Sequence, residues 1–161
     1  MTGTVVQVSI SPGGMPNRPI AEARLTRNGI AGDAWRHPAI HGGPRRAILL
    51  ITAEGIDELA VQGFPVYLGA LGENITTRGL DRRSLRIGQR LEAGEAVIEL
   101  TSIRAPCHAL NVYGKTIQRA MYDARVQAGD AMSPLWGMSG FYAAVIEPGT
   151  VRAGDRIGCI V

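Results

Sequence analysis

The chain has 161 residues, of which 45% are apolar and 19% charged, the composition of a globular domain. No window approaches the roughly 20 apolar residues that a membrane span requires, so we expect no membrane partner. The formal charge of +3 rests on sixteen arginines and a single lysine, Lys115. Because arginine suits bidentate contacts with phosphate or carboxylate, and aromatics are only 5%, the charge predicts a small anionic ligand and not nucleic acid.

The length fits a single domain over residues 1–161. The first ten residues lack the basic segment, apolar core and cleavage site of a secretory signal, so we expect a cytoplasmic protein. Its two cysteines, Cys107 and Cys159, are then predicted to be free thiols in a reducing compartment.

Short apolar or alternating runs separated by glycine and proline predict a mainly β fold. The expected strands cover residues 4–10, 47–52, 96–101, 141–147 and 156–161. Most of the 21 glycines fall between such runs, where turns need positive φ or tight bends. The pattern is typical of a β-barrel or sandwich.

Two segments have helical spacing instead. Residues 53–62 carry Ile56, Leu59 and Ala60 on one face and end before Gly63. Residues 116–128 repeat apolar positions at helical intervals and end before Gly129. We expect both helices to pack on the sheet without carrying chemistry.

The stretch Arg104-Ala105-Pro106-Cys107-His108 is the principal candidate for chemistry. It follows a predicted strand, and Arg104 and His108 would favour the thiolate of Cys107, the form that attacks or binds metal. A short turn starting at Cys107 would add helix-start amides. The alternative is a buried, inert thiol, which is common for a lone cysteine, and we assign that role to Cys159.

Histidines 37 and 41 form a second candidate. A helix would make them a metal pair, but Pro38 and the glycines after His41 disfavour a helix. Two readings remain, a zinc-type site of His37, His41 and Cys107, and a loop that donates hydrogen bonds to an anion, which fits better.

A third candidate is the turn at Glu73 and Asn74, which leads into a strand containing Thr76. An acid/base role for Glu73 would require burial. Several arginines are candidate phosphate clamps, each of which is alternatively a solvated surface charge: Arg45, Arg46, Arg82, Arg83 and Arg86.

The order of these motifs is more specific than any one of them. The chain carries, in sequence, Gly32-Asp33 with His37, His41-Gly42-Gly43-Pro44, Gly72-Glu73-Asn74-Ile75-Thr76-Thr77, Arg104-Ala105-Pro106-Cys107, Gly140-Phe141-Tyr142-Ala143 and Gly154-Asp155. This series resembles the MOSC family, named for the C-terminal domain of molybdenum cofactor sulfurase. The resemblance covers nearly the whole chain and suggests a stand-alone bacterial-type member.

The resemblance implies a MOSC-like β-barrel with a few short packed helices and a molybdenum cofactor of the molybdopterin type. Cys107 would be the metal ligand and the catalytic residue, or would carry sulfur, without pyridoxal phosphate. The cofactor pocket would be lined by Arg104, His37, His41, Glu73, Asn74 and Thr76. The chain departs from the family at Arg45, where an acid is frequent, and at Gln89, where aspartate is common.

Three functions are compatible with this resemblance. The first is a molybdenum-dependent oxidoreductase that reduces N-hydroxylated compounds and receives electrons from a separate electron-transfer protein. The second is a non-catalytic carrier, in which a Cys107 persulfide, supplied by a cysteine desulfurase, serves cofactor maturation. The third is a scaffold that has lost its cofactor and buries an inert Cys107.

Overall fold

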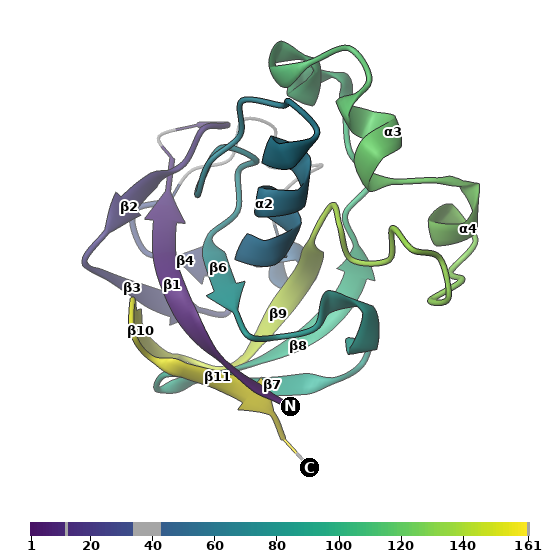
Figure 1. Cartoon of the computed structure of the whole chain (residues 1–161). Coiled ribbons are helices and arrows are strands. Elements are labelled where there is room, and N and C mark those ends of the chain that lie inside the picture. The colour runs from purple at the N-terminus through teal and green to yellow at the C-terminus, as the bar shows by residue number, and fades with distance from the viewer. Residues whose placement is uncertain (12, 34–42, 161) are drawn as a thin grey trace.

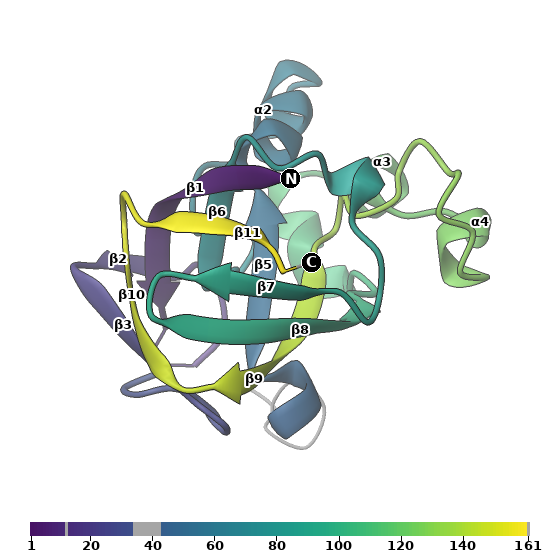
Figure 2. The ribbon, with the colours of Figure 1, turned by 90° about the horizontal axis from the view of Figure 1, so that it is seen from below.

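A closed ring of seven strands forms the centre of the computed structural model, which describes residues 1–11, 13–33 and 43–160. Within these residues the ring order is β11, β7, β8, β9, β5, β6 and β1, and β1 pairs again with β11 (Figure 2). Its strands are β1 (Thr2–Ile10), β5 (Ile48–Thr52), β6 (Ile75–Arg78), β7 (Arg90–Ala93), β8 (Ala96–Ile103), β9 (Phe141–Glu147) and β11 (Arg156–Cys159). The predicted mainly β barrel is therefore confirmed, and the sandwich alternative is not.

Short strands extend the barrel on one side. β2 (Arg18–Ile20) pairs with the end of β1, while β10 (Gly149–Arg152), β3 (Glu22–Thr26) and β4 (Gly29–Ile30) form a separate three-stranded sheet (Figure 1). Within the described residues, β5 and β6 pair in parallel, and the other neighbouring strands of the ring pair antiparallel.

The barrel wall at β5 separates two apolar clusters. Because successive side chains of a strand point to opposite faces, Ile48 and Leu50 join the main core, whereas Leu49 and Ile51 join a second cluster. Both faces are buried, which explains why β5 is a continuous apolar run without alternation.

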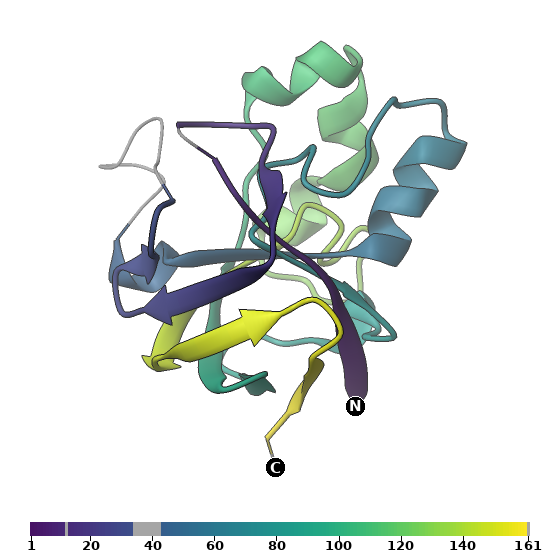
Figure 3. The same cartoon turned by 90° about the vertical axis from the view of Figure 1, so that its left-hand side faces the viewer.

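The second cluster lies between this wall and the helices. α2 (Ala53–Val61) supplies Ile56 and Leu59 to it. The 3₁₀ helix η3 (His108–Tyr113) supplies Leu110, and α3 (Ile117–Met121) supplies Ile117 and Met121. Figures 1 and 3 show α2 and α3 on the same side of the barrel. Two further 3₁₀ turns, η1 (Pro44–Arg46) and η2 (Arg82–Ser84), flank the barrel. The prediction that the helices pack on the sheet is confirmed.

The predicted single helix over residues 116–128 is wrong. The chain leaves the helical conformation at Tyr122 (φ −158°, ψ 137°) and restarts as α4 (Ala124–Gln127). Asp123 causes the restart, because its carboxylate accepts hydrogen bonds from the Val126 amide at 2.8 Å and the Ser133 hydroxyl at 2.9 Å. The segment has apolar residues at helical intervals, but Asp123 caps a second helix and so divides the segment into two short helices.

Candidate functional site

The segment after β8 is held against the start of β9. The Arg104 amide donates to the Gly140 carbonyl at 2.9 Å, and the buried Ser139 hydroxyl donates to the Arg104 carbonyl at 2.6 Å. Gly140 has φ +105°, and a Cβ there would lie 2.7 Å from Ile51 Cγ1. A glycine is therefore needed where the chain turns into β9 beside Arg104.

Cys107 lies three residues further on, as the N-cap of η3. Its thiol is free and half-buried, and its carbonyl accepts the Leu110 amide at 3.1 Å. The predicted turn at Cys107 is confirmed, but the side chain makes no capping hydrogen bond. The neighbouring His108 is exposed. The thiol is thus accessible and not committed to holding the helix.

Arg104 brings a buried positive charge to this segment. The residue is only 8% exposed, and its Nη1 has no hydrogen-bond partner among the described residues. Burial lowers the pKa of the guanidinium, and the ionised forms of Tyr142, Cys107 and Glu73 oppose that shift. Arg104 is therefore the group that electrostatically connects the thiol with side chains from other elements.

Tyr142 and Arg46 add a contact that sequence reasoning missed. The guanidinium carbon of Arg46 lies 5.2 Å from the centroid of the Tyr142 ring, a cation–π contact. The Thr101 hydroxyl donates to the Arg45 carbonyl and thereby ties η1 to β8. The pair Arg45-Arg46 and the motif containing Tyr142 were both visible in the sequence, but nothing in the sequence joined them.

Glu73 is completely buried in the loop before β6. Its carboxylate accepts hydrogen bonds from the Gly69 amide at 2.8 Å, the Leu71 amide at 3.2 Å and the Thr76 hydroxyl at 3.1 Å. Burial is the main cause of the raised pKa of Glu73, and the hydrogen bonds from Gly69 and Thr76 oppose that shift. The burial that an acid/base role requires is present, while the three donors give Glu73 and Thr76 a structural role in shaping the loop.

Asn74 joins three segments around the same loop. Its amide group donates to the Ser9 carbonyl at 3.2 Å and to Asp33 at 2.9 Å, and its oxygen accepts the Leu49 amide at 2.9 Å. Asp33 in turn accepts the Ser11 amide at 2.9 Å. Asn74 therefore fixes β1 and β5 relative to the Gly32-Asp33 motif.

The structure brings together only part of the predicted set. Arg104 interacts electrostatically with Cys107 and Glu73. Thr76 is connected to this set because its hydroxyl donates a hydrogen bond to the Glu73 carboxylate. His37 and His41 lie outside the described residues. Within the described ranges no group of three His, Cys, Asp or Glu side chains is placed to hold a metal ion, so the zinc-type reading stays a prediction.

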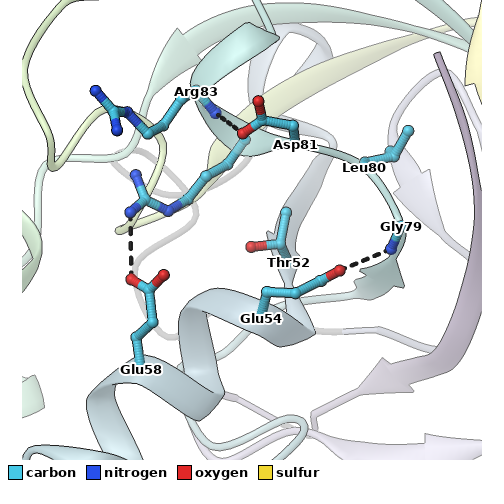
Figure 4. A pocket seen from close by; sticks show the side chains of 8 residues that line it. Thr52, Glu54, Glu58, Gly79, Leu80, Asp81 and Arg83 are labelled. Atoms are coloured by element: carbon cyan, nitrogen blue, oxygen red, sulfur yellow. Dashed lines mark hydrogen bonds and ion pairs between the residues drawn. The ribbon is translucent and has the colours of Figure 1, made fainter.

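A cavity of about 310 Å³ lies at a different place, between the start of α2, the end of β6 and η2 (Figure 4). Three of its carboxylates, those of Glu54, Glu58 and Asp81, already bond to the Gly79 amide, Arg82 and Ser84 respectively. The candidate clamp Arg82 is occupied too, because it donates to the carbonyls of Pro134 and Trp136.

The fold and this site together define a barrel protein that presents an accessible thiol, backed by a buried guanidinium, on a loop at the end of β8. The sequence model of the MOSC domain matches residues 37–158. The chain belongs to the MOSC domain family, and the resemblance inferred from the motif order is confirmed.

Individual relatives agree with this assignment. The chain is 30% identical over 136 residues to "Protein YiiM" of Escherichia coli (strain K12), covering 82% of this chain and 56% of that protein. It is 31% identical over 148 residues to "Uncharacterized protein YflK" of Bacillus subtilis (strain 168), covering 89% of this chain and 62% of that protein. The crystal structure of YiiM from Escherichia coli superposes with a TM-score of 0.69 at 27% identity, covering 100% of this chain and 70% of that one.

The chain thus spans less than two thirds of the length of these two curated relatives. No helix among the described residues is long and apolar enough to cross a membrane.

Proposed function

We propose that this chain binds the molybdenum cofactor through the thiolate of Cys107 and reduces N-hydroxylated compounds. The MOSC family is linked to this cofactor, and the observation that carries the proposal is the free, half-buried Cys107 beside the buried Arg104. Thiolate is a soft ligand suited to a metal that carries sulfur ligands. We further propose that residues 1–161 act as one domain in the cytoplasm.

The residues present fit such a group. Nη1 of Arg104 is buried without a partner, and a buried cation is stabilised when a ligand supplies an anionic atom. In this reaction an N-hydroxyl group, two electrons and two protons give an N–H group and water. When bound, the cofactor supplies the electron transfer at its metal. Cys107 would hold the metal, while Arg104 would balance negative charge in the site.

Metal analysis tests the proposal directly. The protein is expressed in a host that makes the cofactor, purified, and analysed for molybdenum and for reduction of an amidoxime with a chemical electron donor. Wild type and Cys159→Ala should carry molybdenum and turn over, whereas Cys107→Ala should do neither. Cys159 is the matched control because it is also half-buried but packs against the main core. Equal, negligible molybdenum in all three proteins would sink the proposal.

A sulfur carrier is the second candidate function, and the lack of a capping bond from the Cys107 thiol favours it. The thiolate would accept a sulfane sulfur from a cysteine desulfurase and become a persulfide. Intact-mass measurement after incubation with a desulfurase and cysteine should show one added sulfur, which reductant removes and which Cys107→Ser lacks. An unmodified wild-type mass would exclude this function.

A further inference from the structure

The charge on Arg104 is not balanced within the described chain. Glu73 acts electrostatically on Arg104 after Tyr142 and Cys107, but its carboxylate accepts hydrogen bonds from Gly69, Leu71 and Thr76 and none from Arg104. Nη1 of Arg104 is consequently left without an acceptor in a residue that is 8% exposed. Burying an unpaired cation is unfavourable, so this arrangement is stabilised when a ligand provides an anionic oxygen.

A second guanidinium lies on the same tyrosine. Arg46 stacks on Tyr142, and Tyr142 also acts electrostatically on Arg104. Stacking restricts the conformations of Arg46 before a ligand arrives, which reduces the entropy lost on binding. Arg46 is exposed, so its side chain can meet a molecule that approaches from solvent.

The sequence around these two arginines is free of acids. Residues 34–53 and 100–122 contain no aspartate or glutamate, although they include Arg45, Arg46, Arg104, Lys115 and Arg119. The segments that carry Arg46, Arg104 and Cys107 therefore bring positive charge without carboxylates of their own. Guanidinium groups attract anions and repel cations.

We propose that Arg46 and Arg104 form an oxyanion subsite beside Cys107 that selects substrates bearing a carboxylate or phosphate group. The substrate class of the proposed reductase is then an anionic N-hydroxylated compound. The choice of reaction rests on the proposed function, whereas the charge selectivity is a property of the chain and needs no cofactor.

Charge-selective labelling of the thiol tests the subsite without cofactor. In a Cys159→Ser background, Cys107 is labelled at low ionic strength with anionic sulfonatoethyl methanethiosulfonate or cationic trimethylammonioethyl methanethiosulfonate. Each rate is divided by the rate of the same reagent with free cysteine, because a thiolate by itself favours the cationic reagent. After this normalisation the anionic reagent should be favoured about five- to tenfold, as expected for attraction by nearby guanidinium groups at intermediate dielectric. The ratio should fall in Arg46→Ala and in Arg104→Met, with Arg104→Lys retaining part of it as a folded, charge-preserving variant.

Arg83→Ala is the control, because Arg83 is an exposed arginine on η2 beside the separate cavity. It removes the same charge from the molecule and should leave the ratio unchanged. A wild-type ratio of one or below after normalisation to free cysteine, or an equal loss in Arg46→Ala and Arg83→Ala, would overturn the subsite.

Substrate pairs test the selectivity in the loaded enzyme. The KM of benzamidoxime should exceed that of its para-carboxylate several-fold, and Arg46→Ala should remove the difference by raising the KM of the carboxylate. Turnover of both compounds with equal KM would refute the subsite while leaving the proposed function standing. Absence of turnover together with anion-selective labelling would refute the reductase and support the subsite.

Discussion

Arg82 and Arg104 are both buried arginines, at 9% and 8% exposure, yet their surroundings differ. The guanidinium of Arg82 donates to the carbonyls of Pro134 and Trp136 at 3.0 and 2.6 Å and pairs with Glu58 at 3.3 Å, the ion pair drawn in Figure 4. No side-chain hydrogen bond joins Arg104 to the described residues, and its Nη1 is buried without a partner.

We interpret Arg82 as an arginine that the fold uses and Arg104 as one that the proposed ligand would complete. The hydrogen bonds and the ion pair of Arg82 offset the free-energy cost of removing its charge from water. They also hold the loop before β9 against η2 and α2, so the fold already uses this charge. Arg104 is also desolvated, but no hydrogen bond of its side chain within the described residues offsets the free-energy cost. Such a cost is tolerated mainly where a bound ligand offsets it. The following substitutions test the contrast.

Arg82→Met should have the largest effect on stability. It leaves the Pro134 and Trp136 carbonyls without their donor in a buried environment, at a cost of about 3 kcal/mol. For a chain of this length the melting temperature should fall by roughly 6 to 12 °C, measured by calorimetry. Arg83→Met, an exposed neighbour, provides the control. Equal melting temperatures for the two variants would show that Arg82 is not the structural member of the pair.

Glu73→Gln should have the next largest effect. Glutamine offers one acceptor and one NH₂ group where the carboxylate accepts the Gly69 and Leu71 amides, so one amide loses its acceptor. The free energy of unfolding near neutral pH should fall by about 2 kcal/mol. Urea titration measures it, with exposed Glu22→Gln as the control.

The same variant isolates a pH dependence. Burial raises the pKa of Glu73 above its ordinary value of 4.5, so above pH 4.5 the folded state holds its proton more tightly than the unfolded state. The stability that this protonation contributes is present below pH 4.5 and is lost as the pH rises through the folded-state pKa. The stability advantage of wild type over Glu73→Gln should therefore shrink with rising pH. An advantage that grows with pH would mean that the loop amides and Arg104 favour the carboxylate more than burial disfavours it.

The barrel strands and the candidate site differ in how far the sequence predicted them. Glycine-bounded apolar runs predicted the strands, and the predicted 141–147 coincides with β9, because local pattern and tertiary environment agree there. Arg104 and Cys107 were selected as candidate site residues because they are adjacent in one motif, and their role stays a prediction. The contact between Arg46 and Tyr142 could not be predicted, since it depends on the pairing of β5 with β9, which brings η1 onto β9.

A polar side chain explains the main error of the sequence analysis, the single helix predicted over residues 116–128. Asp123 lies within an apolar pattern of helical period, and the pattern alone does not show that its carboxylate caps a new helix and binds Ser133. A short polar side chain inside such a period is itself a signal for a cap. Likewise the motif Glu73-Asn74 was visible, but its use in joining Ser9, Leu49 and the loop amides depends on contacts between distant segments.

Ser139→Ala should have a smaller effect that reaches the functional arginine. The variant removes the 2.6 Å hydrogen bond to the Arg104 carbonyl between two buried residues, at a cost of about 1 kcal/mol. Because Ser139 positions the segment and touches no ligand, the anion-to-cation labelling ratio of Cys107 should also fall. Ser133→Ala, which removes a buried serine bonded to Asp123, should lower stability without changing that ratio. A ratio unchanged in Ser139→Ala would show that the clamp does not position Arg104.

Arg104→Met should have the smallest effect on stability and the largest on function. Methionine fills a similar space without a charge, and replacing an unpaired buried cation by an apolar side chain removes a desolvation cost. The free energy of unfolding should stay within about 0.5 kcal/mol of wild type or rise. Molybdenum content and the anionic preference of Cys107 labelling should both fall. A loss of stability as large as that of Arg82→Met would instead mean that the charge of Arg104 is used within the fold, and the distinction between the two arginines would disappear.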